Sequence, residues 1–172
     1  MDGRSSEQYR QALGLFATGV AIVTTVGSAG EPIGMTVSSF SSVSLDPPLV
    51  LWSVGQQAPE YEAFCQCRYY AIHFLAGKQQ ELSNRFATPG ADKFAALETS
   101  EMIAAGQNTG VPVLSRSLAC LQCEIEQNHL AGDHNILVGR VLSFSVPDSA
   151  ESGGGEPPLL YFGGTYREIA EL

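Results

Sequence analysis

The sequence predicts a mainly β fold, an antiparallel barrel with short helices inserted between its strands. Two observations favour this fold. Several short segments are rich in β-branched and aromatic residues, and turn-forming residues separate most of them. In addition, no G-x-G-x-x-G sequence follows any of these segments, so a doubly wound sheet with a dinucleotide site is not expected.

The expected strands are residues 20–26, 33–40, 49–54, 69–75, 118–130, 135–146 and 159–162. The Gly-containing residues 27–32 predict a turn, so the first two strands should form a hairpin. Asp46-Pro47-Pro48 is expected to break that pairing before the third strand begins. Residues 147–158 contain three consecutive glycines and predict a surface loop.

Helices are expected between and around these strands. The first begins at Ser5 or Ser6, a favourable N-cap, and ends at Gly19. Its apolar residues, such as Tyr9 and Leu13, recur at helical spacing. The other helical segments are 59–67, with a proline in its first turn, 77–87, and a final turn over 166–172.

Charge and hydropathy exclude several classes of function. Nine Lys and Arg against 18 Asp and Glu give a net charge of −9, which argues against nucleic acid and anionic membrane surfaces. No apolar run approaches the ~18 residues of a membrane span, and the polar N-terminus lacks the core of a signal peptide. We therefore expect a cytoplasmic protein with a single domain over residues 1–172.

Four cysteines raise the alternative of a zinc site, from Cys65, Cys67, Cys120 and Cys123. The segment around Cys120 and Cys123 reads as a strand, in which residues three apart point to opposite faces. Two such thiolates cannot bind one ion without a turn between them. No metal site is therefore expected, and buried free thiols are the better interpretation.

Residues 34–48 read GMTVSSFSSVSLDPP and contain five serines and one threonine among large apolar residues. A buried hydroxyl without a partner costs roughly 1–3 kcal/mol. These hydroxyls must therefore either satisfy neighbouring backbone groups or meet a polar group that is not protein. The sequence alone leaves both alternatives open.

A second candidate is the turn over residues 131–135, AGDHN, where Gly132 permits a reversal that projects Asp133 and His134. It is either a plain hairpin turn or the display of an imidazole at the rim of a site. A serine–histidine–aspartate triad is disfavoured because adjacent residues rarely orient one another. The absence of a G-x-S-x-G sequence also argues against a serine hydrolase.

Six segments in order resemble the flavin reductase-like family with an FMN-binding split barrel, which includes reductase components of two-component flavin monooxygenases. They are FATGVAIVTT, GMTVSSFSSVSLDPPLVLWSV, LSNRFA, DKF, GDHNILVGRV and PLLYFGGTY. The resemblance covers residues 9–166, taken as the core of the domain. It implies a six-stranded antiparallel split β-barrel that pairs as a homodimer, with flavin near the interface.

The resemblance also assigns residues. It places the hydroxyl-rich strand along the flavin ring and ribityl chain, and residues 53–60 at the flavin phosphate. It places Ser83 and Arg85 near the phosphate or adenosine end, although Arg85 also fits an ordinary solvated helix face. His134 would lie over the flavin as the catalytic residue that positions the nicotinamide. The implied cofactor-binding residues are Thr36, Ser38, Ser39, Ser42, Ser53, Gln56, Ser83, Arg85 and Phe86.

The activity implied by the resemblance is hydride transfer from NADH or NADPH to FMN or FAD. The reduced flavin would then pass to a partner oxygenase. Two alternatives on the same fold stay open: a non-catalytic flavin carrier or sensor, and an oxygenase that retains its flavin.

Overall fold

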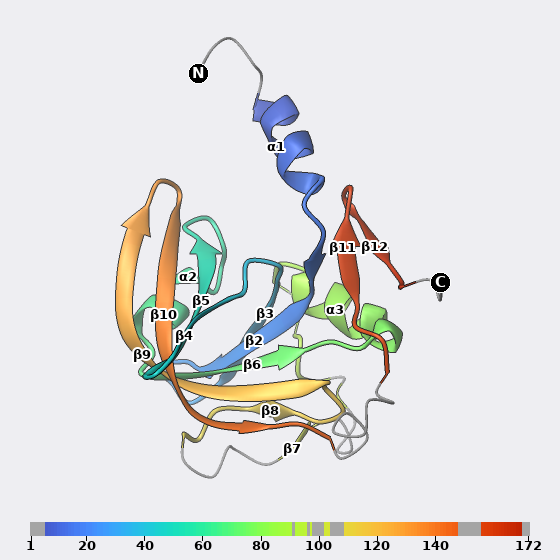
Figure 1. The fold of residues 1–172 in the computed structure, drawn as a ribbon. Coiled ribbons are helices and arrows are strands. Elements are labelled where there is room, and N and C mark those ends of the chain that lie inside the picture. Colours follow the sequence, from blue (N-terminus) through green and yellow to red (C-terminus); the bar gives the residue numbers. More distant parts are fainter. Residues whose placement is uncertain are drawn as a thin grey trace.

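The computed structural model describes residues 6–90, 92–95, 97, 102–103, 109–147 and 156–169. An antiparallel sheet of seven strands dominates it (Figure 1). The strands are β2 (Ala21–Val26), β3 (Pro32–Val37), β4 (Ser41–Leu45), β5 (Pro48–Gly55), β6 (Tyr69–Phe74), β9 (Ala119–Ala131) and β10 (His134–Ser145). Their spatial order is β3-β2-β6-β9-β10-β5-β4. The expected mainly β, antiparallel architecture with few helices is confirmed.

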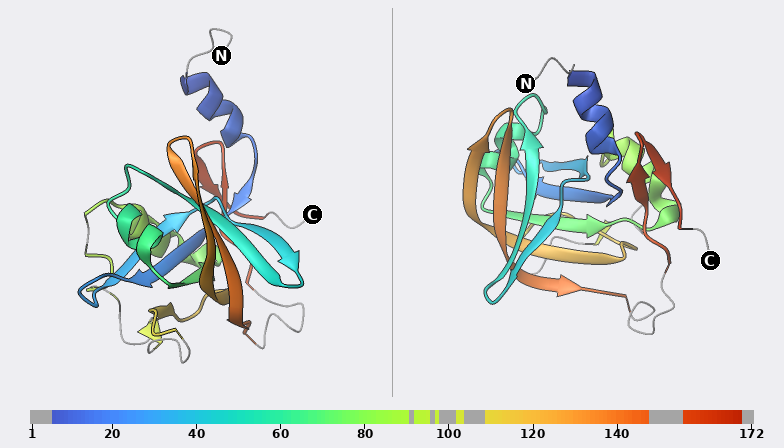
Figure 2. Two further views of the ribbon diagram at one scale, coloured as in Figure 1. Left: turned by 90° about the vertical axis from the view of Figure 1, so that its left-hand side faces the viewer. Right: turned by 45° about the horizontal axis from the view of Figure 1, so that its top comes forward.

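The helices are α1 (Ser6–Gly14), α2 (Tyr61–Gln66), the 3₁₀ turn η1 (Gly77–Gln79) and α3 (Gln80–Ala87). α3 packs against β3, whereas α1 projects away from the sheet and has no buried residue (Figure 2). The prediction that α1 reaches Gly19 is wrong: the helix ends at Gly14, and Thr18–Gly19 form strand β1. None of the described helices is long and apolar enough to cross a membrane.

The hydroxyl-rich segment is not one strand. β3 ends at Val37 and lies at one edge of the sheet, while β4 begins at Ser41 and lies at the other edge. The sheet therefore curls until three residues connect its two edges. The β2–β3 pairing already ends at Val37, and Asp46–Pro47 instead reverses the chain between β4 and β5, so that Leu45 pairs with Pro48. Proline is tolerated at the first residue of a strand, which explains this difference.

A smaller sheet forms beside the first, with the order β1-β11-β12. Its strands β11 (Leu160–Phe162) and β12 (Thr165–Arg167) are joined through Gly163 and Gly164, which both have positive φ. Two consecutive glycines at positive φ permit a tight hairpin. The prediction of a helical turn from Tyr166 is therefore wrong over the described residues, and residues 170–172 lie outside them. A third sheet pairs β7 (Met102–Ile103) with β8 (Val113–Leu114).

The core lies on both faces of β2. Val23 packs with Trp52, Phe64 and other side chains inside the curl, whereas Ile22 packs with Phe86 on the opposite face. This two-sided burial explains why five successive residues of β2, Ala21 to Thr25, are buried.

The two buried cysteines also lie in different clusters. Cys123 belongs to the cluster inside the curl, and Cys120 to a separate cluster with Val111 and Val113. Burial raises the pKa of Cys120 to about 11 and that of Cys123 to about 12. All four cysteines are free thiols. Their placement supports the interpretation of Cys120 and Cys123 as buried apolar groups, because thiols with raised pKa values are poor metal ligands.

His73 connects three strands from a fully buried position on β6. Its Nδ1 lies 3.1 Å from the Ile22 carbonyl oxygen of β2, and its Nε2 accepts a hydrogen bond from Leu114 N of β8 at 3.1 Å. Because Nε2 must accept, Nδ1 carries the proton of a neutral ring. Burial lowers the pKa of His73 from 6.5 to about 4.

His73 should make folding sensitive to mild acid. Between pH 6.5 and about 4 the unfolded chain binds a proton at this residue and the folded chain does not, so stability falls as the pH decreases through this range. The loss should amount to about 3 kcal/mol. Denaturant unfolding at several pH values tests this against His73→Gln, which should lose that part of the pH dependence. Identical pH dependence in both proteins would contradict it.

Candidate functional site

Residues 38–40 connect the two edges of the sheet. The hydroxyl groups of Ser39 and of the nearby Thr36 bind them to neighbouring elements. Ser39 Oγ donates a hydrogen bond to Ser53 O and accepts one from Ser53 N, both at 3.0 Å. Thr36 Oγ1 donates to Ser83 O of α3 at 2.7 Å. These two hydroxyls thus satisfy neighbouring backbone groups, one of the two alternatives left open by the sequence. Ser38, between them, is exposed.

Two cavities meet at Ser38. One, of about 470 Å³, has largely apolar walls that include Phe40 and Phe74. The other, of about 750 Å³, lies between α1 and the β11–β12 hairpin. Phe16, Thr18 and Ser38 line both cavities. Apolar walls with a few polar groups are typical of sites for small organic ligands.

Three other candidates lie on α3. Ser83 is fully buried, and its Oγ is 2.8 Å from the hydroxyl oxygen of Tyr166. Phe86 is also fully buried and contacts Phe94 edge to face, with ring centroids 5.1 Å apart. Arg85 is partly exposed. Of these three residues, Arg85 is therefore the one with a polar group within reach of a ligand at the surface, where its guanidinium can bind phosphate oxygens.

His134 begins β10, and its side chain is half-exposed, at 49%. Its Nδ1 is 2.7 Å from Asp133 Oδ1, and this hydrogen bond holds the pKa of the Asp133 carboxyl below its usual value. The expectation that these adjacent residues would not orient one another is wrong. The ring is also close to Gly55: a Cβ atom added to Gly55 would lie 3.4 Å from His134 Nε2.

Gln56 contacts the same turn. Its backbone N donates to Asp133 O at 2.9 Å, and its side-chain Nε2 donates to Gly132 O at 3.0 Å. The structure therefore brings the sequence-predicted residues together in pairs: Ser39 with Ser53, Thr36 with Ser83, and Gln56 with the His134 turn. Ser42 makes none of these contacts and lies exposed on β4.

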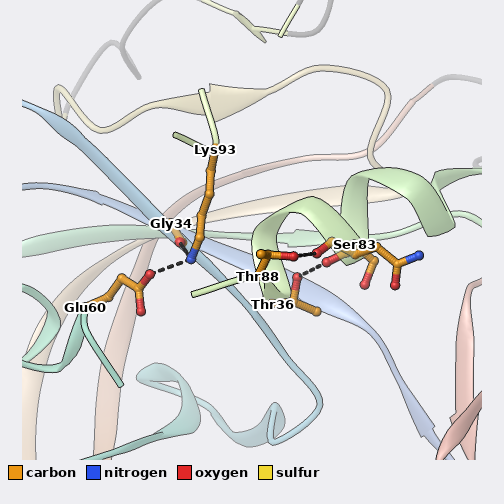
Figure 3. A network of polar contacts seen from close by, with 7 residues as sticks. Gly34, Thr36, Glu60, Ser83, Thr88 and Lys93 are labelled. Carbon is orange, nitrogen blue, oxygen red and sulfur yellow. Dashed lines mark hydrogen bonds and ion pairs between the residues drawn. The ribbon is translucent and has the colours of Figure 1, made fainter. Parts of the chain in front are cut away.

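A buried ion pair holds the loop that leads into α2 (Figure 3). Lys93, only 7% exposed, pairs with Glu60 and donates to Gly34 O at 3.0 Å. Glu60 directly precedes α2 and follows residues 53–59. Lys93 thus joins three segments: this loop, β3 and the chain after α3. The sequence contains no signal for the pairing, because the partners are 33 residues apart and each reads as an ordinary surface charge.

Residues 13–170 match the flavin reductase like domain, so the chain belongs to that family. FMN reductase (NADH) SmoA of Agrobacterium fabrum is 42% identical over 164 residues, covering 95% of this chain and 86% of SmoA. HsaB of Rhodococcus jostii, the reductase subunit of a flavin-dependent monooxygenase, is 36% identical, covering 94% of this chain and 77% of HsaB. The resemblance inferred from the ordered motifs is confirmed.

A solved structure agrees with this assignment. It is NADH:FAD oxidoreductase SgcE6 of Streptomyces globisporus C-1027 in complex with NAD and FAD fragments, with a TM-score of 0.86 at 33% identity. The match covers 99% of this chain and 96% of that one. Three other relatives are longer proteins, of which this chain spans 42%, 56% and 47%.

Replacing Lys93 should be far more harmful than replacing an exposed lysine. Lys93→Met leaves the Glu60 carboxylate buried without its cation, which should cost about 3–5 kcal/mol of unfolding free energy. The double variant with Glu60→Leu should recover most of this loss, since Glu60 makes no side-chain cap to α2. Denaturant unfolding measures both.

The control is Lys78→Met, at the exposed pair between Lys78 and Glu156, where little change is expected. Equal losses for Lys93→Met and Lys78→Met would show that the buried pair does not stabilise the fold.

Proposed function

We infer that this chain is an NAD(P)H-dependent flavin reductase, which transfers hydride from NADH or NADPH to FMN or FAD. The observation that carries the inference is the exposed Ser38 at the junction of two largely apolar cavities, in a chain of the flavin reductase like family. Relatives named as NADH-dependent reductases of FMN and of FAD support it.

The bound flavin would supply the redox chemistry, as the acceptor of hydride from the nicotinamide. The protein needs no metal and no carboxylate pair for this. Its task is to hold two ring systems with the reacting atoms roughly 3–3.5 Å apart. The rigid connection around Ser39 and the apolar walls of the cavities are suited to fixing one ring and excluding water from it.

We propose the following division of roles. Ser38, with the backbone beside it, binds the polar edge of the flavin ring. That backbone is held in position by two sets of hydrogen bonds. Thr36 bonds to α3, and Ser39 bonds to Ser53 of β5. Arg85 takes the phosphate or adenosine end. Ser42, exposed on β4, is a further proposed flavin contact, whereas the fully buried Ser83 and Phe86 support the site from within α3.

His134 is proposed as the residue that positions the nicotinamide. Its ring is half-exposed, and Asp133 holds Nδ1. Nε2 thus stays the nitrogen available to the nucleotide. A neutral or protonated imidazole at this place can orient the carboxamide or stabilise charge on the nucleotide.

We further propose a six-stranded split barrel as the core of one domain over residues 1–172, and a homodimer as the assembly. Large apolar side chains are unusually exposed just after α1, on β4 and on β10, where they include Phe16 (78%), Leu45 (95%) and Phe144 (72%). Exposed apolar surface of this kind is typical of subunit interfaces. A cytoplasmic location is proposed from the free thiols.

The downstream acceptor is proposed to be an oxygenase component that receives the reduced flavin. HsaB is named as such a reductase subunit. A flavin carrier or sensor and a flavin-retaining oxygenase are the alternatives on this fold.

Absorbance of NADH and NADPH should fall rapidly in air when the chain is mixed with catalytic amounts of FMN, FAD or riboflavin added separately. Oxidation that requires added flavin is the result expected of a reductase that uses flavin as a substrate. Tight flavin binding without oxidation would exclude the reductase and support a flavin carrier or sensor. Oxidation that appears only with a third organic substrate would support a flavin-retaining oxygenase.

Sedimentation velocity should show a dimer at micromolar concentration. Replacing the apolar side chains Phe16 and Phe144 by serine should shift the chain toward a monomer, because each removes apolar area from the proposed interface. A control is Lys78→Ser, at an exposed charged side chain outside this apolar set. A wild-type chain that sediments as a monomer at all concentrations would overturn the homodimer.

A further inference from the structure

The turn that contains Gly132, Asp133 and His134 is anchored unequally at its two ends. Below it, Tyr61 Oη donates to Asn135 Oδ1 at 2.7 Å, and Asn135 Nδ2 donates to Asn128 Oδ1 at 2.6 Å. Asn135 is buried, so the base of the hairpin is fixed to α2. The residues beyond it are exposed, and few contacts hold them.

Gln56 makes two of those few contacts. Its backbone and side-chain nitrogens donate to two successive carbonyls of the turn, Asp133 O and Gly132 O. The adjacent residue, Gly55, lies opposite His134 in the β5–β10 ladder and under its ring. The orientation of the imidazole therefore depends on a turn that Gln56 holds in place.

This geometry is hard to reconcile with Gln56 as a ligand of the flavin phosphate. The side-chain amide has two N–H groups, and one of them is already bonded to Gly132 O. Rotating the side chain toward a phosphate would break its bond to Gly132 O and leave Gln56 with only its backbone bond to the turn. The bond to the turn also needs a donor, which a glutamate at this position would lack at neutral pH.

We propose that Gln56 is a positioning residue for the nicotinamide end of the site, which acts by fixing the turn that carries His134, and that it does not bind the flavin phosphate. This rests on the proposed reductase function. Under this proposal, the loop before α2 helps to position the hydride donor as well as the flavin.

The test is a double-mutant cycle between Gln56→Ala and His134→Ala, assayed with NADH and either FMN or riboflavin. Gln56→Ala should lower kcat/KM for NADH about fivefold, the equivalent of one net hydrogen bond. In the His134→Ala background it should have almost no further effect, because the side chain that it positions is gone. Gln56→Glu should behave like Gln56→Ala. Gln66→Ala, at an exposed glutamine at the end of α2, is the matched control and should behave as wild type.

Two results would overturn the proposal. One is the same loss from Gln56→Ala with and without His134. The other is a KM that rises for FMN but not for riboflavin, which lacks the phosphate, because this pattern identifies a phosphate ligand.

A readout in the flavin-free protein separates this proposal from the reductase function. Nuclear Overhauser contacts between the His134 ring and the Gly55 α-protons should be present in wild type and Gln66→Ala and lost in Gln56→Ala. Their persistence in Gln56→Ala would overturn the positioning role even if the chain oxidised no NADH. If Gln56→Ala loses these contacts but the wild-type chain oxidises no NADH, the positioning role of Gln56 stands and only the reductase function is overturned.

Discussion

The structure depends on one short connection, residues 38–40, which joins β3 to β4 at the opposite edges of the seven-stranded sheet. Ser39 holds this connection by bonding both the N–H and the carbonyl of Ser53. A connection so short is possible only if the sheet curls until β3 and β4 approach each other. The curl in turn creates the interior that Trp52 and Phe64 fill. The exposed Ser38 at the cavity junction is a consequence of the same constraint.

The site is held by contacts between segments that are far apart in the chain. Lys93 joins β3 to the loop before α2, and Gln56 joins that loop to the His134 turn. Each of these contacts uses a group that would look solvated in isolation. Together they fix the relative positions of these segments, which the proposed transfer of hydride between two ring systems would require.

The net charge of the chain explains why local hydrogen-bond donors, most of them neutral, must bind anionic nucleotides. The chain has a net charge of −9, so a site for anionic nucleotides must rely on local donors and not on the field of the whole protein. Serine hydroxyls, backbone N–H groups, Arg85 and His134 are the local donors available. The acidic surface also disfavours binding of phosphates elsewhere on the molecule.

The sequence by itself determined the antiparallel β architecture, because short runs of β-branched and aromatic residues bounded by turn residues are local signals, and they located β2, β5, β6 and β9 correctly. The ordered motifs also determined the family. Only the tertiary structure decided that the hydroxyl-rich segment spans two sheet edges, that residues after Gly164 form a strand, and that Gln56 and Lys93 have internal partners. Strand order and buried pairing depend on residues distant in the chain, and local propensity carries no record of them.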